Sequence, residues 1–142
     1  MSDRLLVALL LCFLSPVVWA DSLQFSEPWI RATPPGAVTA AAYLSINNNG
    51  EPDRLLSIEW DRDTPIEIHT VDNQNGMMRM RKLEFLPVPA GQLTTLAPGG
   101  QHIMFVGLQQ GFVAGQSVGL ILIFEQAGRR HVDFPVIDAR GL

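Results

Sequence analysis

The sequence predicts a single all-β domain, either a sandwich or a barrel. Short runs rich in Val, Ile, Leu and aromatic residues alternate with turn signals at intervals of about ten residues, which is the pattern of such folds. The turn signals are stretches rich in Pro, Gly and Asn, at residues 34–36, 47–50, 87–91 and 98–100. No internal repeat, linker or low-complexity segment divides the chain.

The individual strands follow from local patterns. Residues 40–44 have a helical composition, but the run is short and closely bracketed, so we predict a strand. Residues 66–69 and 101–106 alternate apolar and polar side chains, as half-buried strands do. The turn-rich residues 73–76 can fold residues 77–81 back beside the first of these strands. Residues 120–124 and 131–136 predict a hairpin that turns at residues 127–128.

Residues 1–20 have the features of a cleaved signal peptide. Arg4 provides a positive start, residues 5–14 are apolar, and Ala20 is a small residue at the cleavage position. The apolar run is too short for a spanning helix, and no later segment approaches the required length. We therefore expect a periplasmic protein whose mature domain, residues 21–142, is soluble and has no membrane span.

Cysteine content and charge exclude several functional classes. Cys12 is the only cysteine and lies in the signal segment, where Leu11 before it argues against a lipid anchor. A mature chain without cysteine cannot be a blue-copper electron carrier, because that metal site needs a thiolate. The net charge of −4 argues against nucleic acid, which favours a basic stripe.

Four side chains carry the strongest chemical signal. His69, Met80, His102 and Met104 follow the pattern H-x10-M-x21-H-x-M. Thioether sulfur is a poor ligand for magnesium, calcium and zinc but a good one for copper(I). A mixed imidazole and thioether set therefore predicts copper(I) as the bound metal.

Strand alternation predicts how the last two ligands are presented. Ile103 and Phe105 would face the core, and His102 and Met104 would face out. Residues two apart on a strand lie about 6.5–7 Å apart on one face, so both side chains can reach one ion.

The methionine segment shows the same alternation. Met78 shares a face with Met80, and the basic run Arg79, Arg81 and Lys82 is expected on the opposite face. The simplest interpretation of this basic run is a solvent-exposed surface. The alternative is a surface that docks an acidic partner. We interpret Met77 and Met78 as packing residues, or else as spare thioethers near the ion, and His131 as a surface histidine.

The four residues and their spacings resemble the motif of the periplasmic copper(I) chaperones known as PCuAC. The flanking segments, residues 67–69, 76–80 and 98–104, also resemble that family, although Thr70 stands where many members have an optional Met. The resemblance implies a cupredoxin-like β-sandwich with copper(I) bound by His69, Met80, His102 and Met104. It also implies copper delivery to the copper centre of a respiratory cytochrome c oxidase, directly or through another assembly factor. This chain lacks the Met- and His-rich tail of some members, so we predict no second site there.

One enzymatic motif is a chance match. Residues 115–119 satisfy G-x-S-x-G, the nucleophile elbow, which needs a helix after it. Here a strand pattern follows, and His131 precedes the downstream acids instead of following them. We predict that the protein is not an enzyme.

The predicted mechanism is copper transport by ligand exchange, carried out by a monomer. Two imidazoles and two thioethers would hold copper(I) in a distorted tetrahedron, and protons would compete for the imidazoles below about pH 6. Two alternatives stay open: a periplasmic copper-buffering or resistance protein, and a metal-free β-sandwich binding module.

Overall fold

The computed structural model describes residues 21–140, which form ten strands and, within that range, no helix. The all-β prediction is confirmed. The strands are β1 (Leu23–Arg31), β2 (Thr39–Asn48), β3 (Asp53–Glu59), β4 (Ile66–Gln74), β5 (Met77–Leu83), β6 (Leu86–Val88), β7 (Gln92–Leu96), β8 (His102–Val106), β9 (Ser117–Phe124) and β10 (Gly128–Ile137). The predicted signal segment, residues 1–20, lies outside the described residues. None of the described residues belongs to a helix long and apolar enough to cross a membrane.

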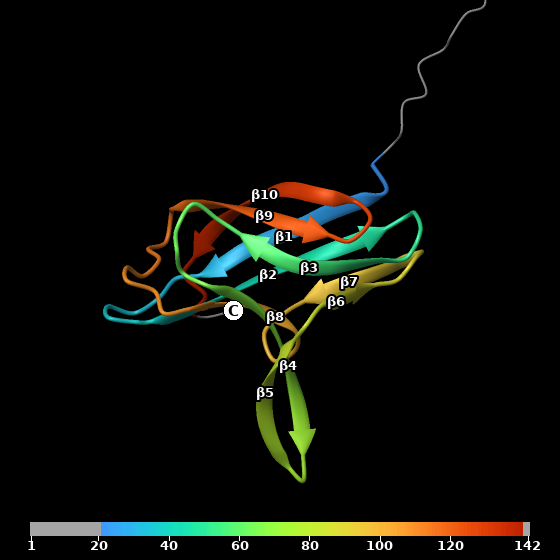
Figure 1. The fold of residues 1–142 in the computed structure, drawn as a ribbon. Coiled ribbons are helices and arrows are strands. Elements are labelled where there is room, and N and C mark those ends of the chain that lie inside the picture. Colours follow the sequence, from blue (N-terminus) through green and yellow to red (C-terminus); the bar gives the residue numbers. More distant parts are fainter. Residues whose placement is uncertain (1–20, 141–142) are drawn as a thin grey trace, which may run out of the picture.

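The strands form two packed layers that share one continuous hydrogen-bonded order (Figure 1). The order is β5-β4-β8-β2-β1-β10-β9-β3-β6, and β7 pairs with β2 beside this path. All pairings are antiparallel except the short parallel contact between β1 and β10. This contact joins the two layers. The β4–β5 hairpin extends beyond the sandwich, as Figure 1 shows.

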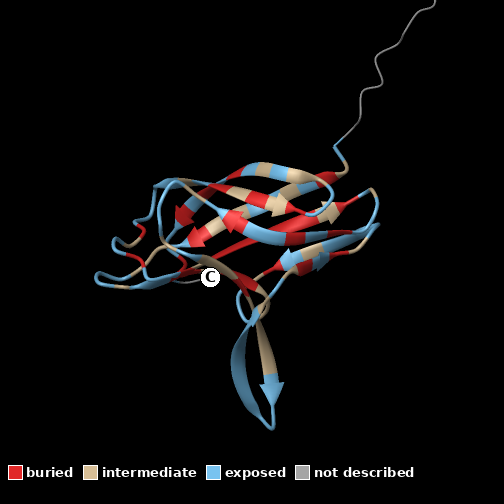
Figure 2. Ribbon diagram, viewed as in Figure 1, coloured by how far each residue is buried: buried red, intermediate tan, exposed pale blue. Residues whose placement is uncertain are grey.

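The core lies between the layers and is built from alternate residues of the strands. In β2, Ala40, Ala42, Leu44 and Ile46 are buried on the inner face. The predicted strand at residues 40–44 is thus confirmed, because tertiary burial decides a segment whose local preference is weak. Figure 2 shows the buried residues concentrated in the sandwich, while the projecting hairpin is exposed or only partly buried.

An aromatic cluster anchors β8 to the core. Phe105 of β8 packs against Trp60 and Phe112, with ring centroids 5.0 Å away in each case. The edge-to-face geometry of both contacts is a favourable one for aromatic rings. Because Phe105 is fully buried, it fixes the position of the neighbouring outward residues of β8.

One buried carboxylate holds the turn between β9 and β10. Asp53 accepts hydrogen bonds from the backbone N–H groups of Gln126 and Ala127, each at 2.9 Å. The predicted hairpin near residues 127–128 is confirmed, with Gly128 opposite Phe124. The residues after Ser117 form β9 rather than a helix, so the structure also lacks the context of a nucleophile elbow at this point.

The turn between β4 and β5 has the expected two-residue geometry. Asn75 and Gly76 have φ values of 52° and 81°, which is the left-handed conformation that a tight hairpin requires. The Asn73 side chain accepts a hydrogen bond from the Gly76 N–H at 3.0 Å. The prediction that residues 73–76 fold the methionine segment back beside β4 is confirmed.

We expect Phe105→Ala to lower the free energy of unfolding by about 3–5 kcal/mol, because it removes a buried aromatic ring and leaves a cavity. Chemical denaturation measures this change. Val106→Ala, at the adjacent and more exposed position, is the matched control and should cost less than about 1 kcal/mol. Equal losses in both variants would contradict the role of the aromatic cluster.

Candidate metal centre

Three neighbouring strands bring the four predicted ligands to one face of the sheet. His69 of β4 lies directly opposite His102 of β8, and Met104 lies opposite Glu67. On the other side of β4, Met80 of β5 lies opposite Val71. Directly paired residues share a face, as do residues two apart on one strand. All four ligand candidates therefore point to the same side.

The two imidazoles of this set lie side by side. Their ring centroids lie 5.7 Å apart with the planes tilted by 48°. His102 faces away from the core, as predicted, yet it is only 5% exposed. Its strand, β8, is an interior strand between β4 and β2, and Tyr43 of β2 lies beside the ring at 6.5 Å between centroids.

Each imidazole uses one nitrogen and leaves the other free. His102 Nδ1–H donates to the Gly100 carbonyl oxygen at 2.9 Å, and His69 Nε2–H donates to Glu67 Oε2 at 2.8 Å. The remaining nitrogens, His102 Nε2 and His69 Nδ1, are buried and have no hydrogen-bond partner among the described residues. A hydrogen bond from one ring nitrogen fixes the tautomer and leaves the lone pair on the other for a metal. These two nitrogens therefore fit a metal ion.

Glu67 connects His69 to the edge strand. Its carboxylate accepts the His69 hydrogen bond on one oxygen and lies 3.1 Å from Lys82 Nζ with the other. The hydrogen bond from His69, followed by that from Lys82, lowers the pKa of Glu67 below its usual value. Lys82 pairs with His69 and so lies on the Met80 face, which corrects the expectation that it lies on the opposite one.

The two thioethers flank the imidazoles at opposite ends. Met104 is two residues from His102 on the same face and is partly buried, whereas Met80 is 61% exposed on edge strand β5. Across the sheet, the backbones of Met104 and Met80 are two strands apart, at about 4.8 Å per strand. Along the strands they are four residues apart, at about 3.3 Å per residue. The structure thus brings the imidazoles together with Met104 nearby, and it leaves Met80 at the outer end of an open row.

Met77, Met78 and His131 are all exposed. Met77 and Met78 are 59% and 64% exposed, so the interpretation of them as packing residues is wrong. The β4–β5 hairpin projects from the sandwich (Figure 1), and none of the other described strands covers its methionines. His131 is exposed on β10, as predicted.

Sequence reasoning missed the groups that orient the ligands. Glu67 could have been identified, because it lies two residues before His69 and shares its strand face. Tyr43 is far away in sequence, and only the β2–β8 register brings it to His102. Trp29 packs on Tyr43 with ring centroids 4.6 Å apart. Burial raises the pKa of the Tyr43 hydroxyl above its usual value.

A family model described as putative lipoprotein LpqE-like matches residues 23–136. The putative lipoprotein Lxx21020 of Leifsonia xyli subsp. xyli is 30% identical over 129 residues, which cover 89% of this chain and 76% of that protein. The uncharacterized protein RP573 of Rickettsia prowazekii is 27% identical over 122 residues, covering 82% of this chain and 67% of that protein.

Solved structures of PCuAC domains have the same fold. The apo PCuAC domain from PmoF1 is 27% identical with a TM-score of 0.69, covering 82% of this chain and 94% of that domain. The copper(I) form of DR1885 from Deinococcus radiodurans is 25% identical with a TM-score of 0.66, covering 82% and 78%. The copper-bound PCuAC domain from PmoF2 has a TM-score of 0.70 at 24% identity, covering 82% and 93%, which shows the fold alone. The chain therefore has a cupredoxin-like β fold, as expected.

We expect Glu67→Gln to weaken metal binding by about tenfold, because the neutral amide is a poorer acceptor for His69 Nε2–H and loses the ion pair with Lys82. A competition titration with copper(I) measures this loss. The matched control is Glu59→Gln, which removes the exposed ion pair with Arg129 on another part of the protein. Equal affinity in both variants would show that Glu67 does not orient His69.

Proposed function

The chain belongs to the LpqE-like family and is a PCuAC-type domain, and we propose from this that it is a copper(I) chaperone. The observation that carries the proposal is the pair of buried imidazole nitrogens, His69 Nδ1 and His102 Nε2, which have no hydrogen-bond partner among the described residues. A buried polar atom without a partner costs free energy, so its retention indicates a ligand. Relatives of the same fold are described as copper-bound, which supports copper as that ligand.

The proposed ligand set is the one that the sequence predicts. His69 and His102 supply the imidazole nitrogens, and Met80 and Met104 supply thioether sulfur from the same face of the sheet. Sulfur ligands select copper(I) over the harder divalent ions. All four donors are neutral, so the only charge in the site would be that of the ion, and the nearby Glu67 carboxylate would partly balance it.

The open arrangement supports transport by ligand exchange. The imidazoles are held by Gly100 and Glu67 on interior strands, whereas Met80 lies exposed on the edge strand. An incoming donor from another protein can therefore bind copper from the Met80 side while the imidazoles still hold it. Transfer then needs no unfolding and no change in oxidation state. Since four protein ligands leave no ready position for a substrate, this arrangement suits a carrier better than an enzyme.

We place this activity in the periplasm, with residues 1–20 as a signal peptide and residues 21–142 as the mature copper-binding domain. The family description and one relative carry the name putative lipoprotein, which supports export. The proposed recipient is the copper centre of a respiratory cytochrome c oxidase or its assembly factor, and this assignment rests on the family resemblance. A copper-buffering protein would share the site but would not deliver copper to such a domain.

The test is an anaerobic copper(I) competition titration of residues 21–142, read with X-ray absorption at the copper edge. One equivalent bound by nitrogen and sulfur neighbours would support the chaperone-type site. No tight binding, or a shell of nitrogen and oxygen only, would leave a metal-free binding module as the better description. Adding an oxidase copper domain then separates the remaining two functions, because only a chaperone transfers its copper rapidly.

We expect Met80→Leu and Met104→Leu each to weaken copper(I) binding by at least about tenfold, because each removes a soft ligand. The fold should persist, since the exchange conserves apolar volume. The same competition titration provides the measurement, and Met77→Leu on the same hairpin is the control. Unchanged affinity in both ligand variants would remove the thioethers from the site.

Copper(I) affinity should fall by at least about tenfold between pH 7.5 and pH 5, because protons compete with the ion for the imidazole nitrogens and a protonated ring cannot bind it. Affinity falls at low pH because more protons then compete with copper(I) for the imidazole nitrogens. The lowered pKa of Glu67 keeps its carboxylate ionised over this range, so the loss would arise from the imidazoles. A flat profile in a competition titration would contradict the two-histidine assignment.

A further inference from the structure

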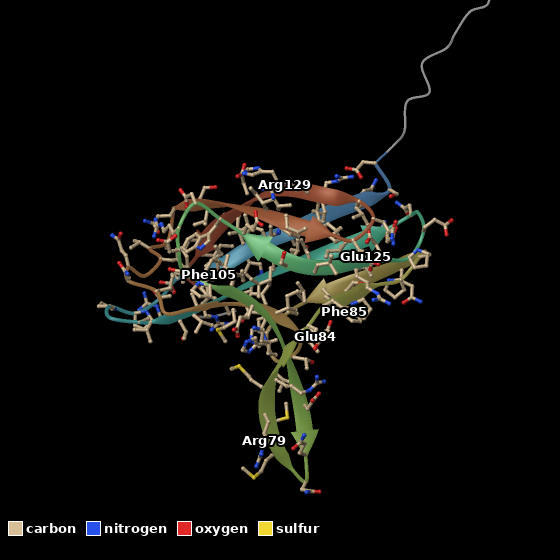
Figure 3. The ribbon with its side chains drawn as sticks, viewed as in Figure 1. Arg79, Glu84, Phe85, Phe105, Glu125 and Arg129 are labelled. Carbon is tan, nitrogen blue, oxygen red and sulfur yellow. The ribbon has the colours of Figure 1, made fainter. Side chains whose placement is uncertain are left out.

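The β5 strand exposes three methionines, and the metal centre above uses only one of them. Met77, Met78 and Met80 are 59%, 64% and 61% exposed, although methionine is usually a core residue. Figure 3 shows sulfur atoms along this hairpin, which extends away from the sandwich. Exposed thioethers are open to oxidation, so their concentration here needs an explanation other than packing.

Strand register separates the three methionines into two groups. Met78 lies opposite Asn73 and Met80 lies opposite Val71, two residues along the same strand, so both point to the face that carries the imidazoles. Met77 lies opposite Gln74 and points to the other face, with Arg79. Met78 and Met80 are about 6.5–7 Å apart at their backbones, which lets both sulfur atoms reach one ion.

The hairpin holds this pair of thioethers in a defined position. The left-handed Asn75–Gly76 turn fixes the register at the tip, and the Asn73 side chain closes it. Below the tip, Arg81 Nε donates to Asp72 Oδ2 at 2.8 Å across the two strands on the face opposite Met78. Met78 is therefore an outward extension of the row formed by Met80, the imidazoles and Met104.

The charge of this face is compatible with a cation. Arg79 and Arg81 alternate with Met78 and Met80 and so point the other way. Lys82 shares the thioether face, but its ammonium group is paired with the Glu67 carboxylate. A monovalent soft cation that approaches the hairpin tip along this face meets thioether sulfur before it meets a positive side chain.

We propose that Met78 and Met80 form a capture site, where copper(I) binds first before it passes to the imidazole pair. This inference rests on the proposed function and adds a step to it. A sulfur–copper bond to Met78 forms as the donor's ligand leaves, Met80 binds next, and the Met78 bond breaks when His69 Nδ1 and His102 Nε2 bind. Copper stays monovalent, and no proton moves, because the two nitrogens already carry lone pairs.

The capture step predicts a kinetic effect without a thermodynamic one. Stopped-flow mixing with a coloured copper(I) chelator measures copper uptake and release, and a competition titration measures the affinity. We expect Met78→Leu to slow uptake and release about equally, by about tenfold, and to leave the affinity within about twofold of the unsubstituted chain. Met77→Leu, which changes an equally exposed methionine on the opposite face, should alter none of these quantities.

The possible outcomes separate the capture site from the chaperone function. If Met78→Leu and Met77→Leu exchange copper at the same rate, the capture site is wrong, and the four-ligand carrier is unaffected. An affinity loss in Met78→Leu comparable to that in Met80→Leu would overturn the inference, because Met78 would then be a permanent ligand. If the unsubstituted chain takes no copper from the chelator at equilibrium, the proposed function itself fails.

Discussion

The pairing of β4 with β8 is the constraint on which the metal centre depends. It places His69 directly opposite His102, and side chains in a strand alternate between faces. A slip of one residue would turn one imidazole toward the core and the other toward the outer face. The apolar residues of the same strands prevent this slip, because Ile68 lies opposite Ile103 and both are buried. The core thus positions the ligands on the other side of the sheet.

The two imidazole nitrogens without hydrogen-bond partners among the described residues lower the stability of the fold. A buried polar atom without a partner costs about 1–3 kcal/mol, and native proteins keep such atoms mainly where they serve a function. Glu67 and Gly100 orient the rings, so each unpartnered nitrogen has a fixed direction before any metal arrives. Preorganisation of this kind lowers the cost of binding, because little order remains to be imposed on the rings.

Different parts of the molecule provide the stability of the fold and the proposed exchange of copper. The sandwich contains the aromatic cluster around Phe105 and the buried residues of β2, and it holds the imidazoles on interior strands. Only the base of the β4–β5 hairpin, through Ile66, Ile68 and Leu83, packs into or against this core, and its outer half depends on its tight turn and on polar pairs such as Asp72 with Arg81. Ligands that must release their cargo belong on an accessible, less buried element. The exposed thioethers of β5 fit that requirement, whereas His102 does not.

The sequence by itself determined the all-β class, the hairpin turn at residues 73–76 and the four ligand candidates, because these follow from local alternation, turn chemistry and ligand softness. Only the tertiary structure decided the burial of His102 and its contact with Tyr43. Those features depend on which strands become neighbours, and long-range pairing leaves no local signal. The same reason explains Met77 and Met78, whose composition suggests packing until the fold shows that the outer half of the hairpin projects beyond the other described strands.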